Sequence, residues 1–278
     1  MQTEVHTSID NGKATTWCNG YAPMPAIQDR MLPADELYGP DPYDVNFCFP
    51  YHAETLYDEK LKLVPFIPRL HAEGFFMHAV SHPEDFQYMR FPVPKTLEEM
   101  LAWFEYTYRR NPANMAYAVM YNDGAGNWTF GAFLSLIACN KETLTAECAM
   151  GINFREFRGG ARATLSASLL LRYCFNTPTE RLPGLGLRKV GWTAHSSNYP
   201  AQALARSLGF RVESMQRWNR VATHGKKGNG RMLRKDDPLG LPGIDDFYLV
   251  MGWDDWEFEG RRLAETALSR KLIPKAKM

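Results

Sequence analysis

The 278-residue sequence has neither a long apolar run nor an excess of charge of one sign. No stretch approaches the ~20 apolar residues that a membrane-spanning helix needs. The start, "MQTEVHTSIDNGKATTW", has no apolar core behind a basic segment, so we expect no secretory signal. The formal net charge is +1, which gives no reason to expect nucleic acid or a membrane as a partner. We therefore expect a cytoplasmic protein.

Cysteine is scarce and unpatterned, which argues against a disulfide framework and against a zinc site. There is no CxxC pair and no HExxH motif. His71, His78 and His82 fall near one face of an expected helix but lack an acidic third ligand, so we predict packing and no metal. The five cysteines, odd in number, are Cys18, Cys48, Cys139, Cys148 and Cys174.

The two familiar glycine fingerprints for nucleotides are also missing. A P-loop needs GxxxxGK followed by Ser or Thr, and a dinucleotide fold needs GxGxxG. Neither occurs, which disfavours ATP and NAD.

What is present is the composition of an ordinary globular chain, with 45% hydrophobic and 23% charged residues. Residues 1–55 are rich in proline and tyrosine without a sustained period, and we expect an irregular N-terminal extension that packs on the core. Residues 56–278 then form one domain with a C-terminal helix. Its expected order is a strand, two helices, three strands, a helix, a strand, a helix and two strands. Because strands follow one another directly, we expect an α/β fold of the α+β kind: a mixed sheet with helices on both faces.

The turn within "FRGGARATLSASLLLRYCF", residues 157–175, is the main candidate for chemistry. Gly159 and Gly160 permit close approach of the backbone to a ligand. The helix that follows presents unpaired N–H groups and its positive dipole end, and both suit phosphate oxygens. A tight turn with solvated arginines is the alternative that these residues alone leave open.

The segment Arg158-Gly159-Gly160-Ala161-Arg162-Ala163 resembles the acyl-CoA signature of the GNAT superfamily, (Gln/Arg)-x-x-Gly-x-(Gly/Ala), with Ala161 in place of the usual glycine. Asn198 followed eleven residues later by Gly209, within "SLGF", resembles the second landmark of that family. The ending "DDFYLVMGWDDW" and the opening "LKLVPFIPRLHAEGFF" are similar to the branch of ribosomal-protein N-terminal acetyltransferases. The resemblance covers about residues 58–256.

The resemblance implies a mostly antiparallel, splayed acyltransferase sheet that binds acetyl-CoA. It implies transfer of an acetyl group to a primary amine of a small molecule or a protein N-terminus, by direct attack. The cofactor-binding residues that it implies are Met150, Gly151 and Ile152 for pantetheine, Arg158, Gly159, Gly160, Ala161, Arg162 and Ala163 for pyrophosphate, and Asn198 near the thioester.

The attacking amine must lose a proton first, because its unperturbed pKa is about 10. Glu147, on the strand before the turn, and His195, three residues before Asn198, are the two candidate bases. A backbone N–H of the splayed strand would stabilise the oxyanion. The family's usual tyrosine, seven residues after the asparagine, is Ala205 here, and the hydroxyls of Tyr199 and Ser197 lie nearby in sequence.

Two other functions stay open at this stage. One is an acyl-CoA-binding protein or biosynthetic enzyme of the same fold that does not acetylate amines. The other is a ribosome-associated module using the basic loop 222–243, which the near-neutral charge disfavours. The acceptor is expected to be a small molecule or peptide, and a homodimer is compatible with the sequence.

Overall fold

The computed structural model describes residues 30–223 and 225–270, together with 5–10, 13–19 and positions 22, 25 and 27. In this described part the strands form an eight-stranded sheet and a separate two-stranded hairpin. The order in the sheet is β3-β4-β5-β6-β7-β8-β10-β9, and of these pairs only β7 and β8 run parallel. The expected mixed, mostly antiparallel sheet is confirmed. The strands are β1 (Val5–Asp10), β2 (Lys13–Cys18), β3 (Tyr57–Asp58), β4 (Leu61–Pro65), β5 (Met115–Asn122), β6 (Trp128–Asn140), β7 (Thr145–Asn153), β8 (Lys189–His195), β9 (Arg211–Val221) and β10 (Gly243–Gly252).

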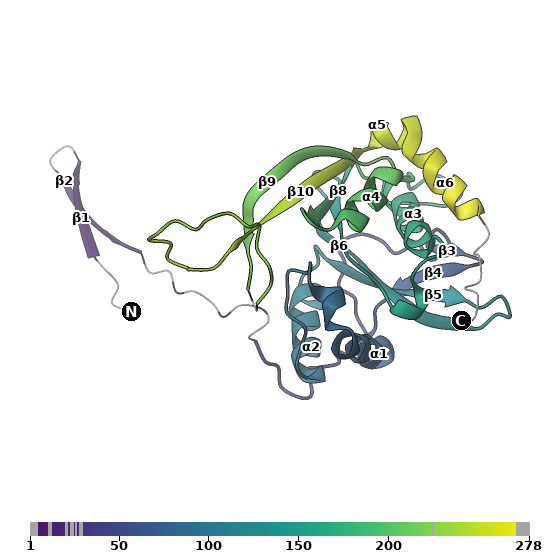
Figure 1. Cartoon of the computed structure of the whole chain (residues 1–278), viewed down its shortest axis with the longest axis horizontal. Coiled ribbons are helices and arrows are strands. Elements are labelled where there is room, and N and C mark those ends of the chain that lie inside the picture. Colours follow the sequence, from purple (N-terminus) through teal and green to yellow (C-terminus); the bar gives the residue numbers. More distant parts are fainter. Residues whose placement is uncertain are drawn as a thin grey trace.

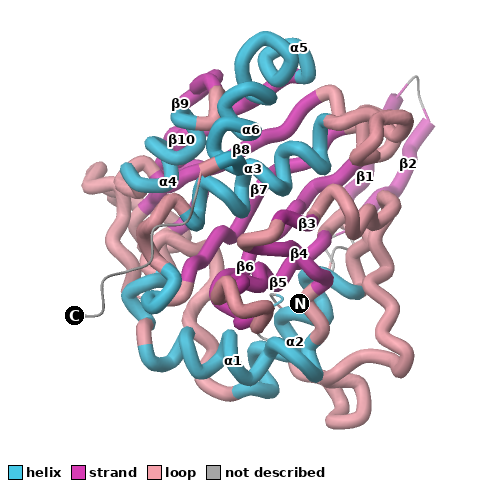
Figure 2. Tube along the Cα trace, turned by 90° about the vertical axis from the view of Figure 1, so that its right-hand side faces the viewer, coloured by secondary structure: helices cyan, strands magenta, loops and turns pink. Residues whose placement is uncertain are grey.

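Helices cover both faces of the sheet, also as expected (Figures 1 and 2). Helices α3, α4 and α6 contribute to one buried cluster, and α1 and α2 to the other. The sheet lies between these two clusters, which we call the α3 face and the α1–α2 face. The helices are α1 (Pro68–Ser81), α2 (Leu97–Phe104), α3 (Arg162–Phe175), α4 (Tyr199–Ser207), α5 (Trp253–Asp255) and α6 (Arg261–Ser269), with short turns η2 (Pro83–Phe86), η3 (Glu105–Arg109), η4 (Arg155–Phe157) and η5 (Trp256–Gly260).

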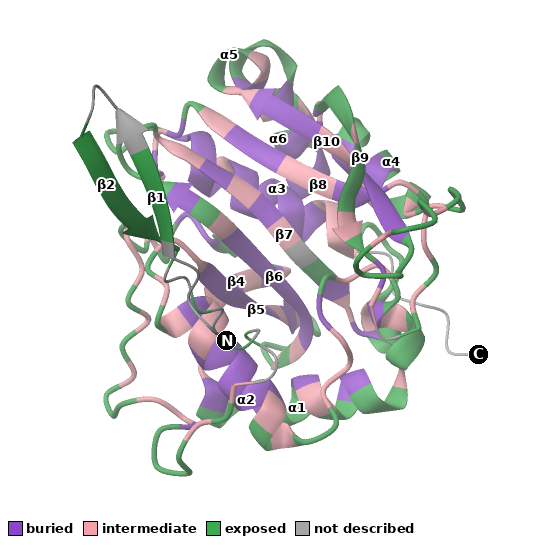
Figure 3. Cartoon of the chain, turned by 90° about the vertical axis from the view of Figure 1, so that its left-hand side faces the viewer, coloured by how far each residue is buried: buried purple, intermediate pink, exposed green. Residues whose placement is uncertain are grey.

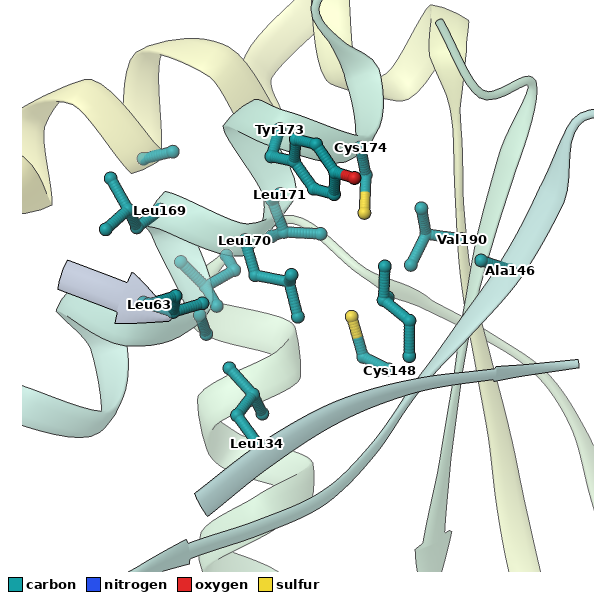
Figure 4. Packing of buried hydrophobic residues seen from close by; sticks show 14 of the residues in the cluster. Leu63, Leu134, Ala146, Cys148, Leu169, Leu170, Leu171, Tyr173, Cys174 and Val190 are labelled. Carbon is teal, nitrogen blue, oxygen red and sulfur yellow. The ribbon is translucent and has the colours of Figure 1, made fainter. Parts of the chain in front are cut away.

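The α3 face is packed with aliphatic side chains. Leu169, Leu170 and Leu171 of α3 are fully buried, and the helix lies over β7 and β8 (Figure 4). Cys148 and Cys174 belong to this cluster, and burial raises the pKa of both thiols. This apolar contact fixes α3, and with it the turn at its N-terminus, to the sheet.

Capping residues explain where two of the helices begin. The Thr96 hydroxyl accepts from the Glu99 N–H at 3.2 Å at the start of α2. The Asn198 side-chain oxygen accepts from the Ala201 N–H at 3.3 Å at the start of α4. Helix α3 begins after Ala161 without a side-chain cap. The Arg162 N–H donates to the Gly159 carbonyl at 3.3 Å, and within the described residues the N–H groups of Ala163 and Thr164 have no backbone acceptor.

The N-terminal region corrects one expectation, because residues 1–55 are not wholly irregular. Strands β1 and β2 pair from Val5↔Cys18 to Asp10↔Lys13. The sequence between them is Asn11-Gly12, which is a strong hairpin signal even though residues 1–55 have no sustained period. This hairpin stands apart from the sheet (Figure 1), and the residues of β2 are exposed (Figure 3).

Later parts of the extension lie against the main sheet. Phe49 is buried in the α3-face cluster, and Leu37 in the other. The division of the chain at residue 55 remains a prediction. At the other end, β10 stops at Gly252 and the residues that follow, expected to continue the strand, start a helix instead. Among the described residues, no helix combines the length and apolar character required to span a bilayer.

Candidate active site

The sheet splays between its two parallel strands. Strands β7 and β8 pair only where residues 145–148 lie beside 189–192. Farther on, β7 continues beside β6, up to Asn153↔Ala132, and β8 continues beside β10, up to His195↔Asp246. We call the segment 149–153 with the turn that follows it the β7 bank, and 193–195 with the residues around them the β8 bank. Both strands can be followed in Figure 3.

A β-bulge marks the β7 bank. Ser135↔Ala149 and Phe133↔Ile152 are the flanking pairs, so Met150 and Gly151 together lie opposite Leu134. A bulge leaves one residue outside the regular ladder, and bulges are common beside active sites. The Met150 side chain lies outside the described residues, Gly151 is exposed, and Ile152 is buried on the α1–α2 face. This segment thus combines irregular pairing with an exposed backbone.

The turn after β7 has a left-handed backbone at three consecutive residues. Their φ angles are 84° at Gly159, 59° at Gly160 and 63° at Ala161, and all three are exposed. The first α-helical hydrogen bond runs from Leu165 N–H to the Ala161 carbonyl at 2.9 Å. Within the described residues, the N–H groups of the positions between Arg162 and Leu165 meet no carbonyl acceptor. The turn therefore presents free backbone donors at a helix N-terminus, as an anion site requires.

Ala161 keeps the glycine-like conformation that its side chain disfavours. A left-handed backbone costs a non-glycine residue about 1–2 kcal/mol. Ala161 therefore differs from the glycine of the family signature by its side chain, while its backbone is left-handed like that of Gly159 and Gly160.

Aromatic contacts anchor this turn to the sheet. A Cβ at Gly131 would lie 2.5 Å from the Phe157 ring, so that ring packs directly on the backbone of β6. Phe157 also stacks on Tyr121 with centroids 5.1 Å apart. The Arg162 guanidinium lies 5.8 Å from the centre of the same tyrosine ring, and its Nε is buried without a partner among the described groups. A polar atom left unpaired beside free backbone donors is what a site for an anionic ligand would show.

Glu147 lies on the α1–α2 face of the sheet. Its neighbours Ala146 and Cys148 belong to the opposite cluster, so Glu147 points away from α3. It is half-buried and pairs across to Gly191 of β8. The hydroxyl of Tyr248 would lie 2.9 Å from a Cβ at Gly191. The Tyr248 side chain therefore extends from β10 over the backbone of β8 at Gly191, the residue that pairs with Glu147. We missed Tyr248 in the sequence, where it was one aromatic residue in an apolar strand.

His195 ends β8, four residues beyond Gly191, on the same face. Its Nδ1 accepts from the Ser197 N–H at 3.0 Å. Burial lowers its pKa, and Arg220 adds to this effect while Asp246 and Asp245 oppose it. A neutral ring in this arrangement carries its proton on Nε2, so it donates a hydrogen bond there and does not accept one.

The two aspartates near His195 were not identified from the sequence, where "DD" marked only the start of a strand. Asp246 is fully buried and accepts from Arg220 Nε at 2.7 Å and Asn219 Nδ2 at 2.9 Å. Asp245 accepts from the Trp218 N–H at 2.9 Å and from Asn229 Nδ2 at 2.7 Å. Trp218 has a φ of 56°, inside a bulge of β9. Both carboxylates are therefore occupied in holding this bulge.

The remaining predicted residues fall near the β8 bank. Asn198 donates its backbone N–H to the His195 carbonyl at 2.8 Å, and its side chain caps α4 as described above. Ala205 is fully buried on the core side of α4, so the position of the family's usual tyrosine belongs to the core. Tyr199 is largely exposed. The structure thus brings Asn198 and His195 together, and it places Glu147 and the phosphate turn along β7. Among the described residues, no group of three or more His, Cys, Asp or Glu side chains could hold a metal.

Comparison with known proteins agrees with this geometry. The profile of the acetyltransferase (GNAT) domain matches residues 60–211, more than half of the chain. The chain therefore belongs to the GNAT acetyltransferase family, a class of acyl-CoA-dependent N-acetyltransferases. No curated protein matches the chain.

Solved structures share the fold at low sequence identity. A GCN5-related N-acetyltransferase from Brucella melitensis has a TM-score of 0.59 and 17% identity, covering 76% of this chain and 84% of its own. The spermidine N-acetyltransferase of Vibrio cholerae, in complex with CoA and spermine, has a TM-score of 0.52 and 16% identity. The match covers 72% of this chain and 99% of that one. A microcin C7 self-immunity acetyltransferase, in complex with acetyl-CoA and AMP, has a TM-score of 0.51 and 13% identity. The match covers 70% of this chain and 93% of that one.

Proposed function

We propose that the protein transfers an acetyl group from acetyl-CoA to a primary amine of a small molecule or of a protein N-terminus. The observation that carries the proposal is the pairing of β7 with β8, which stops after Cys148 and Trp192 and opens the sheet beside the phosphate turn. Acetyl-CoA would supply an activated thioester acyl group. The solved relatives that contain CoA or acetyl-CoA show that this fold accommodates it.

The residues of the β7 bank fit this cofactor. The free N–H groups after Ala161 and the Arg162 guanidinium would bind its pyrophosphate. The bulge at Met150 and Gly151 would present a backbone N–H to the acyl carbonyl oxygen. On the other bank, Asn198 uses its side-chain oxygen in the helix cap, which leaves its Nδ2 to donate to the pantetheine arm.

Glu147 would take the proton from the acceptor amine. Its carboxylate lies on the α1–α2 face with no hydrogen bond among the described groups, whereas the Nδ1 of His195 already accepts from Ser197. His195 would then donate from Nε2 to the acceptor or to a water. The base therefore lies on β7, and the orienting donor lies on β8.

Binding and transfer can be tested separately. Acetyl-CoA should raise the melting temperature, by an amount that grows with its concentration. Release of free CoA thiol should then be measured over amines that include spermidine, free amino acids and peptides with free N-termini. Turnover confined to peptides would support the resemblance to the ribosomal-protein branch. Stabilisation by acetyl-CoA without thiol release for any amine would instead indicate a binding protein of this fold.

A further inference from the structure

One segment runs past both banks of the splay. It is Pro83–Phe91, which begins with η2 after α1, and we call it the strap. The strap has no strand partner, and it contacts three places that are distant in sequence. These places are the phosphate turn, the end of β8, and the loop after β9, which reaches toward the α1–α2 side (Figure 1).

Two ion pairs hold the start of the strap to the phosphate turn. Glu84 pairs with Arg155, and Asp85 pairs with Arg158. The Asp85 carboxylate is almost fully buried and also contacts His78 Nε2 at 3.1 Å. Burial lowers the pKa of His78 although Asp85 opposes the shift. The first arginine of the cofactor signature is thus fixed by a residue of the strap.

The middle of the strap meets the end of β8. The Tyr88 ring lies 5.0 Å from the His195 ring, centre to centre, with an interplanar angle of 49°. Arg90 lies close enough to Asp246 to lower the pKa of that carboxyl, together with the stronger effect of Arg220. Tyr88 is the strap side chain in contact with a predicted site residue of the β8 bank.

Lys226 holds the far end of the strap. Its Nζ donates to the carbonyls of Phe86 at 3.2 Å, Met89 at 2.5 Å and Phe91 at 2.8 Å. An ammonium group has three N–H donors, and these three carbonyls use all of them. Burial, with a smaller effect of Arg220, lowers the pKa of Lys226 to about 8, while the carbonyls favour the charged form. The side chain is therefore charged at pH 7 and ties the carbonyls on both sides of Tyr88 to one point.

We propose that Lys226 is a positioning residue for the acceptor amine. By fixing the carbonyls around Tyr88, it holds this ring against His195 and so shapes the wall against which the acceptor binds. The inference rests on the proposed function. Lys226 lies in a polar, glycine-rich loop. The proposal assigns its side chain to acceptor binding and not to cofactor binding.

The main experiment compares Lys226→Met with wild type in steady-state kinetics and in acetyl-CoA binding. Methionine has an unbranched side chain one atom shorter than that of lysine, and the substitution removes the three donors. We expect the acceptor KM to rise about 10-fold, in line with ~1.4 kcal/mol for lost charged hydrogen bonds. The Kd of acetyl-CoA should stay within about twofold, since the phosphate turn lies at the other end of the strap. Lys227→Met is the matched control, because Lys227 is exposed and forms no hydrogen bond or ion pair within the described part of the chain.

A double-mutant cycle with Tyr88→Ala tests the route of the effect. If Lys226 acts through Tyr88, the double variant should have the acceptor KM of Tyr88→Ala alone. Lys226→Arg, which keeps the charge and the donors, should recover most of the wild-type KM. The proposal would be overturned if the KM changes of Lys226→Met and Tyr88→Ala multiplied in the double variant. It would also be overturned if Lys226→Met raised the Kd of acetyl-CoA as much as the acceptor KM.

Hydrogen exchange gives a readout that does not need turnover. In Lys226→Met, amides of residues 86–91 should exchange faster while those of α3 do not change. Unchanged exchange at 86–91 would refute the positioning role even if no amine proves to be a substrate. Failure of the proposed function would instead show as absent thiol release in wild type. If Lys226→Met does not fold, Lys226→Gln, which also removes the charge, takes its place, and Lys226→Arg remains the variant that keeps the donors.

Discussion

The two banks of the splay are built by different means. On the β7 bank, the features suited to a ligand are backbone features: the bulge at Met150 and Gly151, and the left-handed turn before α3. On the β8 bank they are side-chain contacts: His195 with Tyr88, and Asp246 with Arg220. The turn of the β7 bank is anchored by aromatic rings and by two ion pairs with residues 84 and 85, and the β8 bank by buried charges and by the Tyr88 ring.

We expect this difference to separate cofactor binding from acceptor binding. A backbone cradle can bind the same phosphates whatever side chains surround it, so it suits a cofactor common to a family. Side-chain contacts can change from one protein to the next without altering the sheet, so they suit the choice of acceptor. Four substitutions test this division, in order of decreasing expected effect.

Replacing Asp246 should have the largest effect on stability. Burial alone would raise the pKa of Asp246, but hydrogen bonds from Arg220 and Asn219 outweigh it and lower the pKa below its ordinary value. Asp246→Asn leaves Arg220 without its charge partner and should cost about 3–5 kcal/mol of unfolding free energy. Asp236→Asn, which breaks a well-exposed pair with Arg234, should cost less than about 1 kcal/mol.

The same carboxyl predicts a dependence on pH. Because its folded pKa is depressed, its contribution to stability is complete above the unfolded pKa of about 4 and is lost as the pH falls through the folded pKa. Denaturant unfolding at pH 7 and in steps below pH 4 should show the variant losing less stability than wild type. Parallel losses would mean that the buried pair does not stabilise the β8 bank.

Glu147→Gln should lower kcat about 100-fold, because the amide cannot accept the amine proton. The Kd of acetyl-CoA should not change, since the phosphate turn is intact. His195→Gln keeps an N–H donor and should lower kcat less than about 10-fold. If a thiol-release assay showed a larger loss of kcat for His195→Gln than for Glu147→Gln, the base would be His195 on β8 and not Glu147 on β7.

Gly159→Val should weaken acetyl-CoA binding about 30-fold, because a β-branched residue is strained at a φ of 84° and the turn would have to change its path. Gly124→Val is a matched control: its φ is 87° and, like Gly159, it has open space around the missing Cβ. Both variants should lose stability, and only Gly159→Val should lose affinity in calorimetry. Equal affinities would show that the turn is not the phosphate site.

Ala161→Gly should have the smallest effect. It removes the strain of a left-handed alanine but adds flexibility to the unfolded chain, so a gain of about 0.5–1 kcal/mol is expected. Affinity for acetyl-CoA should stay within about threefold, because the donors of the turn keep their places. A large change in affinity would mean that the Ala161 methyl group itself shapes the site.

The sequence predicted much of the fold because its signals were local. The expected order of strands and helices is confirmed, and the glycine pair lies in the turn before α3. The placement of Glu147 along β7 followed from the same resemblance, and its role as base stays a prediction. The N-terminal hairpin differs from the expected irregular extension although Asn11-Gly12 is a hairpin signal, because residues 1–55 have no sustained period around it.

The sequence by itself determined the order of strands and helices, the glycine turn before α3 and the order of the family's landmarks, because each depends on residues close together in the chain. Only the tertiary structure decided that Asp85 holds Arg158, that Tyr88 meets His195, and that Lys226 binds strap carbonyls. Lys226 is 137 residues from Met89, and a lone lysine in a glycine-rich loop carries no local sign of its partner. Such contacts depend on how the sheet brings distant loops together, so no local pattern in the sequence predicts them.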